Sequence, residues 1–392
     1  MIRRFGWDGD TAFPNRLQRD SSAMTKKDLQ GFDIRYPVGL GAGLATALLF
    51  VSARHQGTAA ALLLSAMSPL PLMIATLGFG TWTGLGAAIA ATVTIMALLI
   101  SVSAALSLQA LLTAALGGLV FASTLALPSW WLAWLAASGR AQVVLPFLRS
   151  RLTGFAGLGT TKESSAQKTP AQKTQDAGPP VYPIGDILMS AAAITFVIVT
   201  ASTLMIVFRH GSYEAALVGL VAKVKPLIVE MLGSRELPKN LDVTLLSRLI
   251  VVTMPATASS LVVLMFLANL WLGGRVVQVS NRLPHAWPDL PRNLRAPRLS
   301  AILFFACLGL AFLHGPGGLV ASIAAASLAL IFALQGLAVI HDLSRGMKFR
   351  TALLGGLYFA LGLLMPWPLI IFLVIGLIEA GFSLRDRKAA GA

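Results

Sequence analysis

The sequence predicts an all-α fold, a polytopic transmembrane helical bundle with about ten spanning helices. Of the 392 residues, 56% are hydrophobic and only 12% are charged, whereas soluble domains carry about 25% charged residues. Several apolar runs reach the length of about 20 residues that a helix needs to cross a bilayer. Lys and Arg gather in the breaks between the runs, which is typical of membrane proteins.

We expect ten spanning segments, the last two of which form a hairpin. In chain order they cover residues 36–53, 58–80, 82–102, 104–127, 184–208, 249–272, 299–313, 319–340, 351–365 and 369–384. Runs of 15 or 16 residues are short for a full crossing and need local thinning of the bilayer or partial burial in the bundle. Trp130, Trp131 and Trp134 follow the fourth run. They fit an interfacial aromatic belt or belong to a further short helix.

The distribution of positive charge predicts the topology. With the N-terminus in the cytoplasm and alternating crossings, cytoplasmic segments hold 24 of the 31 Lys and Arg residues and the opposite side holds 7. This bias follows the positive-inside rule. It predicts a multi-pass protein of the bacterial inner (cytoplasmic) membrane with both termini in the cytoplasm. We expect the lipid bilayer as a partner and no nucleic acid, because the basic residues do not gather on one amphipathic surface.

The polar segments divide the chain into five parts. A cytoplasmic polar tail (1–35) precedes a four-helix membrane part (36–138), and a cytoplasmic linker (139–183) too polar to bury a core is predicted to be disordered. A six-helix membrane part (184–384) contains an extracytoplasmic amphipathic segment (209–246), and a short cytoplasmic tail (385–392) ends the chain.

The amphipathic segment has one strongly periodic stretch. Apolar residues recur at helical spacing over residues 212–232, with Lys and Glu between them. A helix lying along the membrane surface is expected there. Pro226 is expected to bend it or end it.

A proline-rich break interrupts the second run. Ser68, Pro69, Pro71 and Met73 lie within it, and irregular backbone at membrane depth is tolerated only where protein or a water-filled cavity covers it. Because broken helices often mark transporter sites, these residues are candidates for a substrate cavity. The alternative is a kink that neighbouring helices stabilise.

Small residues follow one face of the first run. Gly39, Gly43 and Ala47 recur every four residues, which allows two helix backbones to approach closely. They are candidates for docking a separate membrane or ATPase subunit. The alternative is packing within the chain.

Few polar side chains lie inside the apolar runs. Gln109 and Gln335 are candidates for the cavity or for hydrogen bonds between helices. Glu379 is a carboxylate expected inside a run, and such groups are functional candidates by default. It lies only six residues before Arg385, so a structural role near the interface is the alternative.

The sequence predicts no enzyme. It contains no Walker A, G-x-S-x-G, H-E-x-x-H or C-x-x-C motif. The single cysteine, Cys307, lies in an apolar run, and no cluster has metal-ligand spacing. We therefore expect no catalytic residue, no metal and no cofactor.

Two short patterns carry a resemblance to a family. The break at residues 68–73 is followed by Gly78, Gly80 and Gly84, and 334–338 and 376–385 read LQGLA and GLIEAGFSLR. Both patterns resemble the YybS-like bacterial membrane proteins, a family of unknown function. More distantly, the chain is similar to the S components of energy-coupling-factor transporters, from which it departs in having more helices and a long linker.

These observations lead to two hypotheses. The first is a transport-related membrane subunit that lacks its own ATPase. The alternative is a cell-envelope scaffold that assembles partners through the amphipathic helix and the basic loops without transporting anything.

Overall fold

The computed structural model is built from helices alone in the residues that it describes, which are 34–56, 58–103, 107–138, 182–232, 242–283 and 286–390. The predicted N-terminal tail (1–35) and linker (139–183) lie almost wholly outside these ranges. The front half contains α2 (Arg35–Gln56), α3 (Ala59–Ala66), α4 (Pro69–Phe79), α5 (Thr81–Ser101), α6 (Leu108–Phe121), the π turn η1 (Ala122–Ala126) and α7 (Leu127–Ser138). The rear half contains α10 (Ile184–Arg209), α11 (Tyr213–Leu232), α12 (Val243–Val279), α13 (Leu290–Asn293), α14 (Arg298–Leu310), α15 (Pro316–Leu343), α16 (Arg350–Leu363), α17 (Trp367–Phe382) and α18 (Leu384–Ala390).

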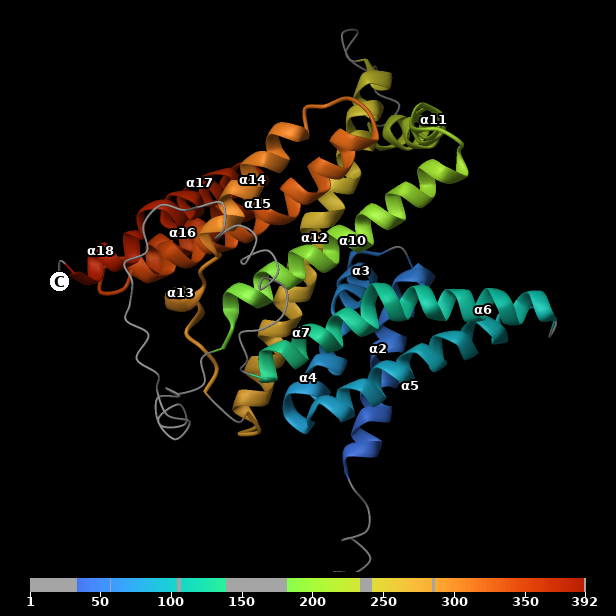
Figure 1. The fold of residues 1–392 in the computed structure, drawn as a ribbon, viewed down its shortest axis with the longest axis horizontal. Helices are drawn as coiled ribbons and strands as arrows, with labels where there is room; N and C mark the ends of the chain where they lie inside the picture. Colours follow the sequence, from blue (N-terminus) through green and yellow to red (C-terminus); the bar gives the residue numbers. More distant parts are fainter. Residues whose placement is uncertain are drawn as a thin grey trace, which may run out of the picture.

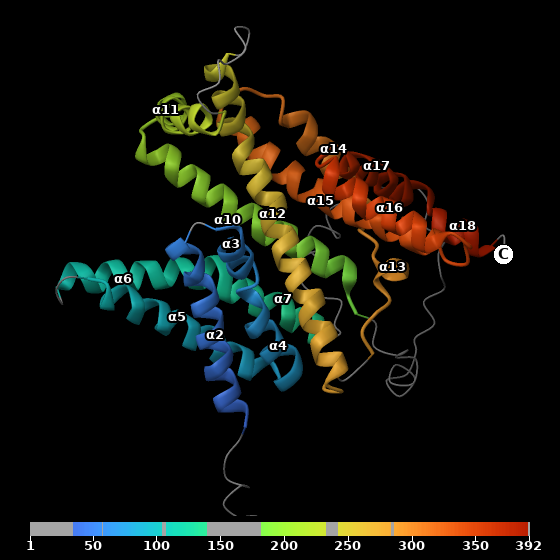
Figure 2. The same ribbon diagram turned by 180° about the vertical axis from the view of Figure 1, so that it is seen from behind.

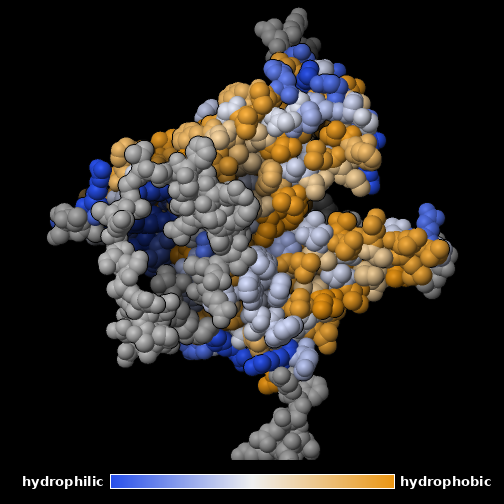
Figure 3. All heavy atoms as spheres, viewed as in Figure 1, coloured by the Kyte–Doolittle hydropathy of each residue, from blue (hydrophilic) through white to orange (hydrophobic). Residues whose placement is uncertain are grey.

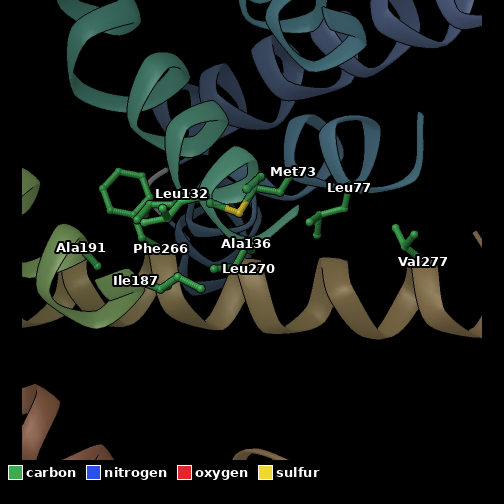
Figure 4. Close-up of a cluster of buried hydrophobic side chains, with 11 residues drawn as sticks. Met73, Leu77, Leu132, Ala136, Ile187, Ala191, Phe266, Leu270 and Val277 are labelled. Atoms are coloured by element: carbon green, nitrogen blue, oxygen red, sulfur yellow. The ribbon is translucent and has the colours of Figure 1, made fainter. Parts of the chain in front are cut away.

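The two halves form separate groups of helices that meet along α12 (Figures 1 and 2). In Figure 1, α2 to α7 lie below and to the right, whereas α14 to α18 lie to the upper left. Apolar side chains of α4 and α7 pack against α10 and α12 where the halves meet (Figure 4). Met73, Leu132 and Phe266 are fully buried in this shared core. The halves are therefore joined mainly by apolar packing.

Among the described residues, every regular element is a helix, which confirms the all-α fold, and seven helical segments are long and apolar enough to cross a membrane, as a multi-pass protein requires. Three further apolar helices, α14, α16 and α17, have 13, 14 and 16 residues, or about 20–24 Å at 1.5 Å per residue. The hydrocarbon core of a bilayer is about 30 Å thick. The count of ten complete crossings therefore stays a prediction.

The outer surface of the helices is largely apolar, as lipid contact requires. Large side chains on α6 are exposed, including Leu112 at 61% and Leu116 at 64%. Figure 3 shows hydrophobic residues over the arm formed by α5 and α6, whereas hydrophilic residues gather near α11 and α13.

The fourth run continues further than predicted. Residues 108–138 form one continuous helical segment in which the Leu127 N–H donates to the Ala122 carbonyl, five residues back. This π turn precedes Pro128, which has no N–H to donate to the α-helical ladder. Trp130 lies in the same helix and its Nε1 donates to the Thr81 carbonyl at 3.0 Å. The tryptophans thus lie in α7, a continuation of the fourth run and not a separate spanning helix, and their place in an interfacial belt stays a prediction.

The amphipathic helix is present, and Pro226 does not end it. α11 continues through Pro226 to Leu232. Leu217 and Ile228 are buried, and Lys225 Nζ donates to Thr244 Oγ1 of α12 at 3.0 Å. The apolar face of α11 therefore packs inward against the rest of the rear half.

The longest helix exceeds its prediction at both ends. α12 has 37 residues, about 55 Å at 1.5 Å per residue, against the 24 residues predicted for 249–272. The loop between the sixth and seventh predicted runs consequently begins only after Val279. Ser259 and Ser260 donate to the carbonyls of Ile323 and Ala326, so buried hydrogen bonds fix α12 to α15.

Two glycines bring α15 and α17 into backbone contact. A Cβ added at Gly336 would lie 1.9 Å from the Phe372 carbonyl oxygen, and one added at Gly376 would lie 1.9 Å from that of Phe332. No real Cβ atom fits at such a distance. The close approach of these two helices therefore requires glycine at both positions.

We predict that Gly376→Ala destabilises the protein whereas Gly381→Ala, in the same helix, does not. A Cβ at Gly376 must push the α15 backbone away, at a cost of about 1–3 kcal/mol or more. A Cβ at Gly381 meets nothing within 4 Å. Thermal unfolding in detergent measures the difference, and equal melting temperatures for the two variants would contradict the contact.

Candidate functional site

The proline break lies inside the protein. α3 ends at Ala66 and α4 begins at Pro69, so the break is present where the sequence predicts it. Ser68 and Met73 are fully buried. Ser68 Oγ has no hydrogen-bond partner among the described residues, and Met73 belongs to the core shared by the two halves. Four cavities among the described residues, including the two described below, are lined neither by these residues nor by Pro69 or Pro71.

An asparagine of the other half stabilises this break. Asn269 Nδ2 of α12 donates to the carbonyl oxygen of Ala66 at 2.8 Å and to that of Met265 at 2.7 Å. Ala66 ends α3, so its carbonyl has no partner from a continuing helix. Asn269 was missed in the sequence analysis, although a lone amide within an apolar run is itself a signal.

The small-residue face of α2 is covered by α5 of the same chain. A Cβ added at Gly43 would lie 2.6 Å from the Ala87 carbonyl oxygen, and one at Gly39 would lie 3.1 Å from that of Thr83. Ala47 is fully buried in the front-half core. This face is therefore not available to a separate subunit, and the alternative of packing within the chain describes it.

The two glutamines have different environments. Gln335 is buried, and its Oε1 accepts from the Ala296 N–H at 2.6 Å while its Nε2 donates to the Gly376 carbonyl at 3.0 Å. It thus links α15, α17 and the loop before α14. Gln109 is exposed near the start of α6 and lines none of the four cavities.

Glu379 is buried in an ion pair. Its carboxylate accepts from Arg385 Nε at 2.8 Å and from the Arg385 backbone N–H at 3.2 Å, and both side chains are 2% exposed. Arg385 also donates to the carbonyls of Pro291 and Leu294 at 2.7 and 2.9 Å. The pair holds the segment before α14, residues 286–297, against the end of α17. Arg385 was assigned to the cytoplasmic tail, but the structure places it in α18, folded back onto the bundle.

Two further ion pairs hold the same segment at the surface. Arg345 binds both carboxylate oxygens of Asp289 at 2.7 Å, and Arg295 binds those of Asp386 at 2.7 and 2.5 Å. The hydrogen bonds from Arg345 and Arg295 lower the pKa of Asp289 and of Asp386, respectively. Both carboxylates are therefore charged at neutral pH and pin the segment from two sides.

An apolar cavity lies beside this segment, and the sequence analysis did not find it. Its volume is about 370 Å³, and its walls come from α10, α12, α15, the segment before α14 and Tyr358 of α16. The lining consists mainly of Leu, Ile, Ala, Pro and aromatic side chains, and His341 and Tyr358 supply polar groups. A volume in the range of 300–1,000 Å³ with few polar groups is typical of small-molecule sites. We call it the α10–α12–α15 pocket.

A second, smaller cavity provides a comparison. It has about 240 Å³ and lies between α10, α11 and α12, with Leu217, Pro255 and Ala258 among its lining. Its walls supply Tyr213 and Thr203 as polar residues.

No cluster of three or more His, Cys, Asp or Glu that could hold a metal is found within the described ranges.

Comparison with known proteins gives no relative, because no protein-family model, no curated protein and no solved structure matches the chain.

We predict that Glu379→Gln lowers stability strongly. Removing one partner of a buried ion pair costs about 3–5 kcal/mol, because the Arg385 guanidinium loses its counter-ion without reaching water. The matched control is Glu214→Gln, whose side chain is 71% exposed and 4.0 Å from Arg248, where about 0–1 kcal/mol is expected. Thermal unfolding that gives equal losses for both variants would argue against a buried pair.

Acid should loosen the segment before α14. The pKa of Asp289 and of Asp386 is lowered in the folded protein, so their stabilisation is present above the ordinary aspartate pKa of 3.8 and is lost as the pH falls through the folded values. Because the Asp289 pair is half-exposed, protection of amides 290–294 should fall by no more than about five-fold on its account.

Hydrogen exchange corrected for the intrinsic rate measures this loss. In Asp289→Asn, part of the loss should already be present at neutral pH. Protection in the unmodified chain that stays constant from pH 7 to pH 3 would show that these pairs do not hold the segment.

Proposed function

We propose that this chain is a transport-related multi-pass subunit of the bacterial inner membrane that lacks its own ATPase and receives an apolar molecule in the α10–α12–α15 pocket. The pocket is the observation that carries the proposal. It is large enough for a small ligand, and pockets between helices of a bundle are common binding sites. The burial of the proline break moves the expected ligand site from α4 to this pocket.

The proposed topology has both termini in the cytoplasm. Seven crossings would place the termini on opposite sides, so this topology requires that either one or all three of α14, α16 and α17 cross as well, and ten crossings require all three. Their shortness is compatible with crossing if the bilayer thins locally or neighbouring helices cover their ends. The excess of Lys and Arg in the predicted cytoplasmic segments supports the arrangement.

A partner subunit needs a surface other than the small-residue face of α2. α16 offers one, because none of its residues is buried in the chain. Phe359 and Leu363 on this helix are 70% and 68% exposed. The S components of energy-coupling-factor transporters dock through the first helix. The packing of α2 against α5 therefore weakens the resemblance to them. Membership of the YybS-like family stays a prediction.

The scaffold is the alternative function, and fewer observations favour it. The apolar face of α11 is turned into the protein, and Arg295, Arg345 and Arg385 already bind carboxylates. Both features leave less free surface for assembling partners. The exposed apolar residues of α16 are compatible with either function.

Purification from native membranes in mild detergent tests the proposal. We expect an ATPase subunit to co-purify and ATP hydrolysis to depend on it, because the chain has no nucleotide-binding motif. Exchange of Phe359 and Leu363 for Ser should release that subunit, whereas exchange of the exposed Leu112 and Leu116 of α6 should not. Capture of cell-wall or division proteins without any ATPase would favour the scaffold.

A further inference from the structure

The polar groups of the α10–α12–α15 pocket have defined hydrogen-bonding roles. His341 Nδ1 lies 3.0 Å from the Leu337 carbonyl oxygen, which only accepts, so Nδ1 carries the hydrogen. In the tautomer with its one ring hydrogen on Nδ1, Nε2 is an acceptor, and the Tyr358 hydroxyl lies 3.1 Å from it. Tyr358 therefore donates to His341, and its oxygen keeps free lone pairs for a donor on a ligand.

A tryptophan at the same pocket has an unused donor. Trp287 lines the pocket, and its buried Nε1 has no acceptor among the described residues. The indole is held in place, because it packs on Gly274, where an added Cβ would lie 2.4 Å from the ring. It also meets Tyr182 edge-to-face with ring centroids 5.2 Å apart. An indole N–H buried without an acceptor is costly, and a ligand oxygen would satisfy it.

The size and lining of the pocket limit the rest of the ligand. About 370 Å³ corresponds to roughly twelve non-hydrogen atoms at about 30 Å³ each. No Asp, Glu, Lys or Arg lines the pocket, so a charged group would be desolvated there without a counter-ion. The body of the ligand is thus apolar, and its polar group is uncharged.

We propose that the pocket binds a neutral single-chain lipid alcohol, whose hydrocarbon lies among the aliphatic residues and whose hydroxyl meets Trp287 and Tyr358. A hydroxyl both accepts and donates, so it can take the Trp287 N–H and donate to the Tyr358 oxygen. This inference rests on the pocket invoked in the proposed function and names the class of its ligand. It does not depend on an ATPase partner.

Photolabelling in lipid nanodiscs tests the pocket. The probe is a ten-carbon primary alcohol with a diazirine in mid-chain, which has as many non-hydrogen atoms as dodecanol, and we expect it to label peptides that contain residues 264–271 and 334–341. Ala268→Trp, on the pocket wall of α12, should reduce this labelling at least ten-fold. The matched control is Ala258→Trp on the same helix, which lines the second cavity and should leave labelling unchanged.

Competition tests the class of ligand. Unlabelled dodecanol should displace the probe better than dodecane or dodecylammonium. Trp287→Phe removes the N–H and should weaken competition by dodecanol about 2- to 10-fold, the range of one hydrogen bond, with no change for dodecane. Tyr358→Phe, which keeps the ring, provides a second variant with the same expected direction.

The possible results separate the ligand from the function. Equal competition by dodecanol and dodecane, or unchanged competition in both variants, would overturn the lipid alcohol while leaving an apolar pocket in place. Absence of labelling in the two peptides would overturn the site. Neither result affects recovery of an ATPase subunit, which tests the proposed function separately.

Discussion

Hydrogen bonding within the chain governs this structure, because lipid offers no partner for a polar backbone group. Within a helix the backbone N–H and C=O groups bond to each other, so partners are missing only where a helix ends or is interrupted. At the break after α3, Asn269 of α12 donates a hydrogen bond to the Ala66 carbonyl. Before α14, Gln335 of α15 accepts from the Ala296 N–H. In both places a buried amide from a distant helix replaces the missing ladder partner.

The same constraint explains why the two halves are not independent. The break in the second run lies in the front half, but its amide partner lies on α12 in the rear half. Around it, Met73, Leu132 and Phe266 form a common core. A predicted linker between the halves would suggest two separate units, whereas the shared core makes the relative position of the halves part of the fold. Association of helices in lipid relies on such close packing and hydrogen bonds rather than on exclusion of water.

Apolar composition was sufficient to predict the all-α class and most helix positions, because run length directly reflects bilayer thickness. It failed where a helix tolerates proline, as at Pro128, because a π turn preserves the helix there. It also could not identify partners. Gly43 and Gly376 are both small residues at helix contacts. Only the fold shows that Gly43 packs against α5 and Gly376 against α15, both of the same chain.

The candidate site illustrates the same limit more sharply. Glu379 and Gln335 could be singled out because polar groups are rare in apolar runs, but their partners Arg385 and Ala296 lie in segments that look like ordinary polar ends. The pocket could not be predicted at all, because its walls come from five separate stretches of the chain and none of its residues is unusual for its helix. A cavity depends on how several helices pack against one another, and the sequence of one run does not determine that packing.

The pocket and the ion pairs are neighbours for a physical reason. Leu290, Pro291 and Leu294 line the pocket, and the same short stretch carries Asp289 and the carbonyls that bind Arg385. A wall formed by a segment without long helices has few internal hydrogen bonds, so its position depends on the ion pairs outside it. The charges thus maintain an apolar surface without entering it. A ligand with an apolar body and a neutral hydroxyl suits such a wall, because it fills the space and leaves the surrounding charge pairs intact.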